Sequence, residues 1–578
     1  MKLDALRKSI KALGNRSIVG MYGIRDHGHF NGPRWTHDHN AACFNPDGAL
    51  EWYFELERLT KKKHDNDLEG QWRQTPLNFI IDDRDCIVAN VTSFSGSSFV
   101  SNCNEFRVDC SQIDKKIKRP ILGARGSVSS DPLNNIPAFS FSQELAHAFS
   151  AVAFSGLKLP ALFVHADGAA SVSSFSAFVI THDEVKCIRS DWSNVDAAMN
   201  FGYNDLFHEM LGQNEDERLA TAGRLMGYAA HALGMYDEEM IEWLTKNQWF
   251  RTYWQNRESF HREALKKYEW QGSVTDLNDD FVKRIASCAQ VYLERIMLNN
   301  LKKLKEKTGL DRLYAGGGIF LNIQLNKLIE DSKIFDEFYV APNTSDTGLG
   351  LGAGLFLNWV KNEHLDVVSP YIQYDPLNHD IEPKVSFDYV DEIVDRLLKG
   401  QTLAMVVGKG EAGPRSLGHR AIICVPTKLA AQRVSMDIKK REWYRPVSPI
   451  GLYDHVKEFY EGDSSVSLLK YMLTVRTPKG LNEQWYGGVH VDNTSRLQVV
   501  DRSDKDNSLL IKILDELWTR HRIPFLINTS LNRSGEPIAN SYDEARVVSK
   551  EIGLDGVIMN GVPEWFSDSS VKYPGCVK

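Results

Sequence analysis

The sequence predicts a mixed α/β protein of more than one domain, and two observations carry this prediction. Short apolar runs typical of strands alternate with longer helical stretches up to about residue 355, and they include Asn78 to Ile81, Ala161 to Val164 and Phe338 to Ala341. The stretch from Pro370 to Pro383 is punctuated by proline and lacks periodicity, and a new strand follows at Thr402 to Val407. A chain of 578 residues has room for about two to four domains.

The chain opens on a predicted helix followed by a strand. Four apolar residues recur at helical spacing: Leu3, Leu6, Ile10 and Leu13. Gly14-Asn15 ends this pattern, and the first strand is predicted at Ser17 to Ile24. We therefore expect a helical extension at 1–16, a first domain at 17–368 with a helical insertion near 236–280, and a second domain at 384–578.

Composition narrows the class of protein. The formal net charge is −8, and no apolar run approaches the roughly 20 residues of a membrane helix. The opening residues Met1 to Arg7 lack the apolar centre of a secretory signal, so we expect a cytoplasmic protein without membrane contact. The eight cysteines show no CxxC or CxxH spacing, which argues against a structural zinc site or a disulfide framework.

Three loops of the first domain are candidates for anion or metal binding. Gly316-Gly317-Gly318 follows the strand-like run Leu313 to Ala315 and precedes a helix, a junction where backbone N–H groups can face a phosphate. A plain turn is the alternative reading. Asp346 lies in a second loop between a strand and a helix of small residues. Asp167 ends a third strand and could turn its carboxylate toward the same cleft.

Histidines form two further candidate groups. His147 lies on a helical stretch with Gln143 on the same face, although a lone helical histidine is more often structural than a metal ligand. The histidines at 27, 29, 37 and 39 could suggest a metal site. Their irregular spacing around Gly32-Pro33 favours a loop instead.

The second domain carries cations suited to a phosphate. Arg415 and Arg420 lie five positions apart on the turn Gly413 to Arg420. Lys439 and Arg445 follow, and a strand-like run leads to the short polar donors of Asn528 to Asn532. Arginine grips two phosphate oxygens at once, whereas lysine supplies a point charge, so the sequence predicts an anion clamp here.

Taken together, the motifs resemble the O-carbamoyltransferases of the nodulation-protein-U type over about residues 17–560. The phrases that carry the resemblance stand in the same order as in that family: Glu57 to Asp65, Leu225 to Ala229, Gly316 to Asn322, Asp346 to Gly354, Gly413 to Arg420, Arg441 to Pro446, His490 to Arg496 and Asn528 to Asn532. Each phrase alone is weak, but eight in order are specific.

The resemblance implies an N-terminal ASKHA-type domain, related to actin-like ATPases and to tRNA threonylcarbamoyl transferases, and a C-terminal YrdC-like domain. In the family the C-terminal domain converts carbamoyl phosphate and ATP to carbamoyl adenylate. The N-terminal domain then transfers the carbamoyl group to an acceptor hydroxyl beside a nucleotide-bound metal, usually iron.

The resemblance also assigns site residues. Those on carbamoyl-phosphate and adenylate positions are Arg415, Lys439, Arg445, Asn528 and Ser530, with Arg420, His490 and Arg496 as neighbours. Those on metal positions are His147, Asp167 and Asp346, and those on nucleotide positions are Gly317, Gly318 and Asn322. His39 is the candidate catalytic histidine, as a base or a metal ligand, with His147 as the alternative for that role.

Two departures from the family concern the metal. The family usually reads His-His-x-x-His-Ala where this chain has Gln143 to Ala148, so Gln143 replaces one histidine ligand. An amide oxygen binds a borderline metal less well than imidazole does, which leaves iron and magnesium both open. The family's early His-Asp pair is displaced after an inserted loop from Arg25 to Trp35, and either His37 or His39 could take its place.

The acceptor remains open between sugar or natural-product hydroxyls and the hydroxymethyl group of 5-hydroxymethylcytosine in DNA. The inserted loop and the segment Trp243 to Trp270, which interleaves aromatic and basic residues, favour nucleic acid. An amphipathic helical insertion with a core of aromatics is the alternative, and the net negative charge supports it. Rival functions are an ASKHA-type sugar kinase, which leaves the second-domain arginines unexplained, and a non-catalytic nucleotide-binding scaffold.

Overall fold

The computed structural model describes residues 2–23, 37–66, 86–92, 107–108, 122–131, 134–168, 170–171, 173–192, 204–212, 218–374, 384–462 and 466–566. Two predicted segments lie outside these residues: the strand Asn78 to Ile81 and the inserted loop Arg25 to Trp35. The description resumes at His37. We call residues 2–374 the first half and residues 384–566 the second half.

The first half contains two sheets. The first sheet has the order β3-β2-β1-β4-β7-β6-β5, and the second has the order β10-β9-β8-β11-β12. The strands of the first sheet are β1 (Ser17–Tyr22), β2 (Asn40–Phe44), β3 (Leu50–Glu55), β4 (Cys86–Thr92), β5 (Arg107–Val108), β6 (Leu122–Asp131) and β7 (Asn134–Ser142). The strands of the second are β8 (Ala161–Ala166), β9 (Phe175–Ile180), β10 (Val185–Asp191), β11 (Arg312–Gly316) and β12 (Glu337–Val340).

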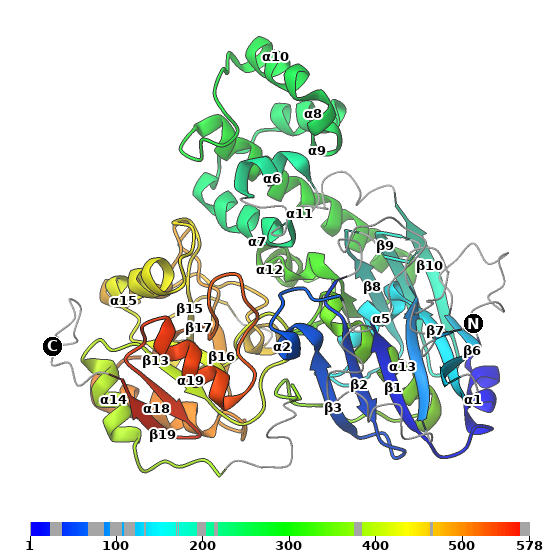
Figure 1. Ribbon diagram of the computed structural model, residues 1–578. Coiled ribbons are helices and arrows are strands. Elements are labelled where there is room, and N and C mark those ends of the chain that lie inside the picture. Colours follow the sequence, from blue (N-terminus) through cyan, green and yellow to red (C-terminus); the bar gives the residue numbers. More distant parts are fainter. Residues whose placement is uncertain are drawn as a thin grey trace.

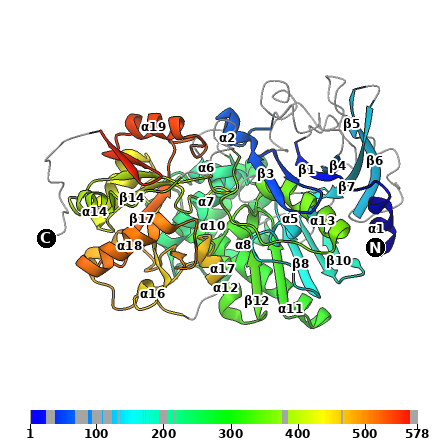
Figure 2. The same ribbon diagram turned by 90° about the horizontal axis from the view of Figure 1, so that it is seen from below.

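Two buried helices lie between these sheets, as Figures 1 and 2 show from two directions. The helix α5 (Gln143–Ser150) contacts β8 and β11, and α13 (Leu349–Asn362) contacts β1, β2 and β4. The Ser142 hydroxyl caps α5 by accepting a hydrogen bond from the Leu145 N–H at 3.3 Å. Since every residue of α5 is buried, its single histidine is held inside the protein.

A helical extension rises from this body at the top of Figure 1, and we define it as the described residues between 204 and 279. Its helices are α6 (Asp205–Leu211), α7 (Arg218–Ala229), α8 (Glu238–Lys246), α9 (Trp249–Thr252) and α10 (Arg257–Tyr268). The long α11 (Asp280–Thr308) follows them in the chain and contacts α7 and α8. Its aromatic side chains pack against one another in a small core that includes Trp243, Trp249, Tyr253, Phe260 and Trp270.

The second half is built on a third sheet with the order β16-β15-β17-β14-β13-β18-β19. Its strands are β13 (Leu403–Val406), β14 (Arg420–Cys424), β15 (Ser448–Leu452), β16 (Gln498–Val500), β17 (Phe525–Ser530), β18 (Gly556–Met559) and β19 (Val562–Trp565). Its helices are α14 (Val390–Leu398), α15 (Lys428–Gln432), α16 (Tyr453–Val456), α17 (Val466–Lys470), α18 (Ser508–His521) and α19 (Tyr542–Glu551). The inner strand β13 pairs with β14 on one side and with the late strand β18 on the other.

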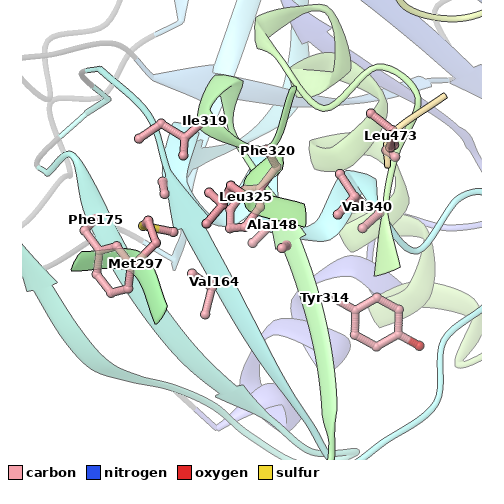
Figure 3. Close-up of a cluster of buried hydrophobic side chains, with 14 of the residues drawn as sticks. Ala148, Val164, Phe175, Met297, Tyr314, Ile319, Phe320, Leu325, Val340 and Leu473 are labelled. Carbon is pink, nitrogen blue, oxygen red and sulfur yellow. The ribbon is translucent and has the colours of Figure 1, made fainter. Parts of the chain in front are cut away.

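The two halves share a core and buried polar contacts. Leu473 of the second half belongs to the same apolar cluster as Phe320 and Val340 of the first, as Figure 3 shows. Arg58 on α2 (Leu56–Thr60) is fully buried and donates hydrogen bonds to second-half carbonyls, including Gly413 O at 2.7 Å. This contact needs a particular placement of both halves, because a buried guanidinium is costly without its partners.

The mixed α/β class predicted from the sequence is confirmed. The opening helix α1 spans Leu3–Lys11, and its Leu3 and Ile10 are fully buried, so it packs on the body of the first half. The first strand ends at Tyr22, two residues before the predicted end. No helix in the described part of the chain is long and apolar enough to cross a membrane.

Candidate active site

A pocket of about 120 Å³ lies where the two halves meet. The first half contributes α7 and the start of α12 (Ile323–Ser332), and the second half contributes the loops around its third sheet. The lining residues are Gly223, Met226, Gly227, Ala230, Ile323, Gln324, Pro414, Arg415, Ser416, Arg441, Arg445, Pro446, Ser448, Met472, Val475, His490, Thr494, Arg496, Asn528, Thr529 and Ser530. Its walls are therefore partly apolar and partly cationic.

Four arginines crowd into this pocket: Arg415, Arg441, Arg445 and Arg496. Within the described residues, the carboxylate in salt-bridge contact with one of them is Glu442, which meets Arg445 at 3.2 Å. The Arg415 Nε and Arg496 Nη2 atoms are buried without a hydrogen-bond partner in the described part of the chain. Buried donors of this kind call for an acceptor, and an anion would supply one.

The electrostatics agree with an anion site. Burial, followed by the charge of Arg445, lowers the pKa of Arg415 to about 10. Burial, together with Arg445 and Arg415, lowers the pKa of Arg441 to about 9. Burial and the same neighbours hold the pKa of Arg496 well below its usual value. Like charges held together out of water favour the binding of a multiply charged anion.

The loop that carries Arg415 is fixed by a buried carboxylate. Glu411 Oε1 accepts hydrogen bonds from the backbone N–H groups of Leu417 at 2.9 Å, His419 at 2.8 Å and Arg420 at 2.9 Å. Asn528 adds a bond from its Nδ2 to Ser416 O at 3.0 Å. The sequence therefore forms a pre-shaped loop rather than a free turn at the edge of the pocket.

Arg420, a predicted member of the anion clamp, makes its hydrogen bonds inside the second half. It begins strand β14, is almost fully buried, and donates hydrogen bonds to four backbone carbonyls: Val407 O, Gly408 O, His419 O and Asn540 O. It does not line the pocket. Arg441 lines the pocket together with Arg415. It begins the motif Arg441 to Pro446, but the sequence prediction gave it no role of its own.

Lys439 and Ser530 have different places. Ser530 lines the pocket, and its hydroxyl donates to Asn532 Oδ1 at 2.6 Å. Lys439 does not line it; its Nζ donates to Ser530 O at 2.8 Å and to Asn532 O at 2.8 Å. Lys439 therefore contacts the loop of Ser530 and Asn532 from outside the pocket lining, and its predicted catalytic role stays a prediction.

The remaining predictions for the second half meet in the pocket. His490 lines it, and its Nε2 donates to Tyr444 O at 3.0 Å. Arg224 on α7 was not predicted; it pairs with Glu442, the partner of Arg445, and so joins the helical extension to the pocket. Arg224 stands next to the predicted motif Leu225 to Ala229. Its contact with Glu442 comes only from the fold, so the sequence alone did not single it out.

A second cluster, of carboxylates and imidazoles, lies between the two sheets of the first half. His147 Nε2 is 3.2 Å from Asp346 Oδ1 and 3.9 Å from Asp167 Oδ2. The Tyr22 hydroxyl donates to Asp346 Oδ2 at 3.1 Å. Burial opposes the charged form of His147, but its contact with Asp346 outweighs burial and raises its pKa. The three residues predicted to bind a metal are thus brought together.

His37, one of the two histidines left open for the family's early His-Asp pair, reaches this cluster. His37 Nδ1 donates to Asp38 Oδ2 at 2.9 Å and lies 3.8 Å from Asp346 Oδ2. Burial lowers the pKa of His37, but the nearby carboxylates of Asp346 and Asp38 prevail and raise it to about 10. His39 is fully buried and its ring packs edge-on against Tyr22, with ring centroids 5.5 Å apart. The catalytic role expected of His39 stays a prediction.

The glycine loop serves close packing. A Cβ on Gly317, whose φ is +108°, would lie 2.2 Å from Ala166 O. The Gly317 N–H donates to Thr344 O at 2.8 Å, and the Gly318 N–H donates to the Asp167 carboxylate. Both N–H groups expected to face a nucleotide are therefore used inside the protein. The Asn322 side chain caps α12 and also exchanges two hydrogen bonds with the Gln290 side chain, so it too is used inside the protein.

The donor set of this cluster fits a metal ion. Imidazole nitrogen and carboxylate oxygen are the ligands that proteins use for divalent transition metals. The His147 ring nitrogens are buried without a hydrogen-bond partner in the described residues, although Nε2 faces Asp346. His165 on β8 also lies in this cluster, stacked on His147 with ring centroids 5.2 Å apart. Sequence analysis missed His165 because it stands inside an apolar strand.

The aromatic and basic segment Trp243 to Trp270 does not form an open stacking surface. Trp243, Trp249 and Phe260 are buried in the core of the helical extension. Lys246, Lys267 and Arg257 pair with Glu242, Glu239 and Glu209. The described part of this segment therefore follows the amphipathic reading rather than the nucleic-acid reading.

Comparisons with known proteins agree with this arrangement. The family description "Carbamoyltransferase N-terminus" matches residues 137–355, and "Carbamoyltransferase C-terminus" matches residues 394–563, together about two thirds of the chain. Nodulation protein NolO of Bradyrhizobium diazoefficiens is 30% identical over 48% of this chain and 53% of its own length. This chain therefore spans about half the length of NolO.

Two further relatives point the same way. Nodulation protein NolNO of Sinorhizobium fredii is 27% identical over 91% of this chain and 78% of its own length. The 3'-hydroxymethylcephem-O-carbamoyltransferase of Amycolatopsis lactamdurans is 28% identical over 43% of this chain and 47% of its own length. The N-terminal match covers α5, Asp167 and Asp346, and the C-terminal match covers every second-half residue of the pocket. The chain belongs to the carbamoyltransferase family.

Proposed function

We propose that this protein is an O-carbamoyltransferase that uses carbamoyl phosphate and ATP, through carbamoyl adenylate, to carbamoylate an acceptor hydroxyl. The observation that carries the proposal is the crowding of Arg415, Arg441, Arg445 and Arg496 in one pocket between the halves of a carbamoyltransferase-family chain. Such a pocket suits substrates whose reacting groups are phosphates.

The reaction divides between the two clusters. Water releases phosphate from carbamoyl phosphate and leaves carbamate; a carbamate oxygen attacks the α-phosphorus of ATP, and pyrophosphate departs. The arginines of the pocket offset the negative charge that gathers during this step. The acceptor hydroxyl oxygen then attacks the carbamoyl carbon and loses its proton, the bond from that carbon to the AMP oxygen breaks, and AMP departs with that oxygen and its electron pair.

The second step is assigned to the cluster around Asp346. Its carboxylates and imidazoles can accept the hydroxyl proton as the new C–O bond forms. His147, Asp167 and Asp346 would hold a divalent metal, iron or magnesium, which supplies a Lewis acid for a phosphate or carbonyl oxygen. A small hydroxyl-bearing acceptor is favoured over DNA, because Trp243, Trp249 and Phe260 of the helical extension are buried and present no stacking face to a base.

This function is matched to two domains. Residues 17–368, with two sheets enclosing α5 and α13, support an ASKHA-type transfer domain, and the helices near 236–280 support an insertion within it. Residues 384–578 would form a YrdC-like domain that makes the adenylate. The first 16 residues would then be a separate N-terminal element, whose helix α1 packs on the transfer domain through Leu3 and Ile10.

The first test measures products of ATP in the purified protein. We expect AMP and pyrophosphate to form only when carbamoyl phosphate is present, and Arg441→Ala to reduce this turnover at least about 100-fold, as for lost charge stabilisation in other enzymes. Arg520→Ala, at an exposed arginine that pairs with Asp391, is the matched control. ADP formation independent of carbamoyl phosphate would establish a kinase instead, and no turnover would leave a binding scaffold.

A second test identifies the acceptor. Mass spectrometry after incubation with ATP and carbamoyl phosphate should show one added carbamoyl group on a sugar or natural-product alcohol. DNA containing 5-hydroxymethylcytosine is incubated in parallel. A gain on the DNA would refute the preference for a small acceptor while leaving the carbamoyl-transfer proposal intact.

A further inference from the structure

One histidine of the first half has no role in the predicted site. His165 lies near the end of β8, where it pairs in register with Ser176 of β9 and Gly316 of β11. Successive strand residues face opposite sides of a sheet, so His165 and the following Asp167 face the same side. That side is covered by α5, because the His165 ring stacks on that of His147.

The His165 ring is fully buried, and neither of its nitrogens has a hydrogen-bond partner in the described residues. Buried polar atoms in proteins are almost always paired, so two such atoms on one ring are unusual. Valine or isoleucine would fill the same space in an apolar strand without this cost. The position thus has a polar side chain without a polar partner.

Other metal-ligating atoms surround it. The ligand atoms offered by His147, His165 and Asp167 all lie within 4.8 Å of one another. Asp346 Oδ1 extends the group, since it is 3.2 Å from His147 Nε2. Metal–ligand bonds of about 2.0 to 2.2 Å let one ion bridge atoms separated by up to about 4 Å, so small side-chain rotations close this group around an ion.

The amide of Gln143 is directed elsewhere. It stands where the family resemblance expects a histidine, one turn before His147 on α5. Its Nε2 lies 3.5 Å from the Tyr22 hydroxyl, which itself donates to Asp346 Oδ2. Gln143 therefore contacts the edge of the cluster through a tyrosine, and the cluster is one imidazole short unless another element supplies it.

We infer that His165 is a metal ligand of this chain and that, with His147, Asp167 and Asp346, it forms a site of two imidazoles and two carboxylates. This inference rests on the metal centre within the proposed function, but not on the acceptor or on the adenylate. Two neutral nitrogen ligands favour a borderline transition ion, such as Fe²⁺, Mn²⁺, Co²⁺ or Zn²⁺, over Mg²⁺, which prefers oxygen ligands and water.

The test uses Co²⁺ added to the metal-free, full-length protein. X-ray absorption spectroscopy of the wild type should show two imidazoles on the cobalt. His165→Val should weaken Co²⁺ binding by more than about tenfold, since the loss of even outer-shell partners costs that much. His455→Val, at a buried histidine of the second half that stacks on Trp518, should leave the affinity unchanged.

A rescue variant separates ligation from packing. In the double variant His165→Val/Gln143→His, the family's imidazole returns on α5, and Co²⁺ binding should recover. One imidazole on the wild-type cobalt, or unchanged Co²⁺ affinity in His165→Val, would overturn the inference. His37 is the other histidine near Asp346, so His37→Val is the matched variant, and its cobalt spectrum should still show two imidazoles. That spectrum tests the assignment to His165 even if the His165 variant fails to fold, and one imidazole in His37→Val would overturn it.

Failure of this inference can be told from failure of the proposed function. Pyrophosphate release dependent on carbamoyl phosphate belongs to the second-half pocket and should persist in His165→Val. Two imidazoles on cobalt without any such release would support the metal site and refute carbamoyl adenylate formation. Pyrophosphate release together with one imidazole on the cobalt would support carbamoyl adenylate formation and refute the ligand role of His165.

Discussion

Glu55 Oε1 accepts a hydrogen bond from the backbone N–H of Gly413 at 2.5 Å, which joins the end of β3 to the loop that carries Arg415. The Tyr53 hydroxyl contacts the same carboxylate at 2.9 Å and Thr347 O at 2.7 Å, next to Asp346. The pocket loop and the metal-cluster loop are therefore connected through two buried side chains, and a shift of one should be felt by the other.

The first prediction concerns Gly413→Ala. Gly413 has φ +91°, and its Cβ would lie 2.4 Å from Pro342 O, a backbone atom of the Asp346 loop. The variant should lose about 2 kcal/mol or more of unfolding free energy, from strain and overpacking together. Gly535→Ala, with φ +81° and open space around it, carries the strain alone. Urea unfolding of both variants compares the two costs, and equal losses would contradict the contact described here.

The second prediction concerns Arg58. It is fully buried, donates to Gly413 O at 2.7 Å, and pairs with Glu55 at 3.3 Å. Arg58→Ala leaves Glu55 buried without its countercharge, so we expect a loss of about 3 kcal/mol or more. Removal of the exposed Arg520, by contrast, should cost less than about 1 kcal/mol. Denaturant titrations measure both, and a small loss at Arg58 would mean that the interface opens to water.

The third prediction separates stability from function at Arg415. Burial and the charge of Arg445 disfavour the charged Arg415 in the unliganded protein. Arg415→Met should therefore leave the unliganded protein as stable or raise its melting temperature, because an apolar side chain of similar length avoids the buried charge. Turnover of ATP with carbamoyl phosphate should fall at least about 100-fold. If Arg415→Met were destabilised but kept full turnover, Arg415 would be a structural residue and not an anion-binding one.

The fourth prediction concerns pH and Glu411. Burial raises its pKa, but His419 and the backbone N–H of Arg420 prevail, and the net direction is downward from 4.5. A lowered folded-state pKa gives stability that is present above the unfolded value and lost as pH falls through the folded value. Glu411→Gln should thus be less stable than the wild type above about pH 4.5, by about 1 to 3 kcal/mol.

The stability gap at Glu411 should narrow as pH falls below 4.5, because the wild-type carboxylate becomes protonated. Thermal melts across pH 3 to 7 follow the gap. A gap independent of pH would show that the three N–H groups tolerate an amide oxygen equally well. The Michaelis constant for carbamoyl phosphate should rise in Glu411→Gln, since this carboxylate shapes the loop of Arg415.

Local patterns predicted much of this structure. Helical spacing located α5 and its His147, and the glycine run marked the junction after β11. Arginines, amides and hydroxyls from three separate motifs meet in one pocket, because each motif lies in a loop or strand end of the third sheet. The sequence alone was sufficient to locate residues whose role depends on a short local motif.

Local patterns failed where a role depends on direction in space. Arg420 and Arg415 share a loop, but β14 begins at Arg420 and turns its side chain toward carbonyls. His37 and His39 are two residues apart in the sequence, and it is the fold that brings His37 to 3.8 Å from the Asp346 carboxylate. His165 resembled part of an apolar strand until α5 was packed above it.

The strand order of the third sheet has a consequence for the protein as it leaves the ribosome. Both sheets of the first half are made only of residues up to 340, so they can assemble early in synthesis. Strand β13 must wait for β18, which arrives about 150 residues later at Gly556–Met559. Until the loop of Gly413 has been made, Arg58 and Glu55 also lack the second-half partner that they contact in the finished protein, so the nascent first half carries charged groups that only later residues cover.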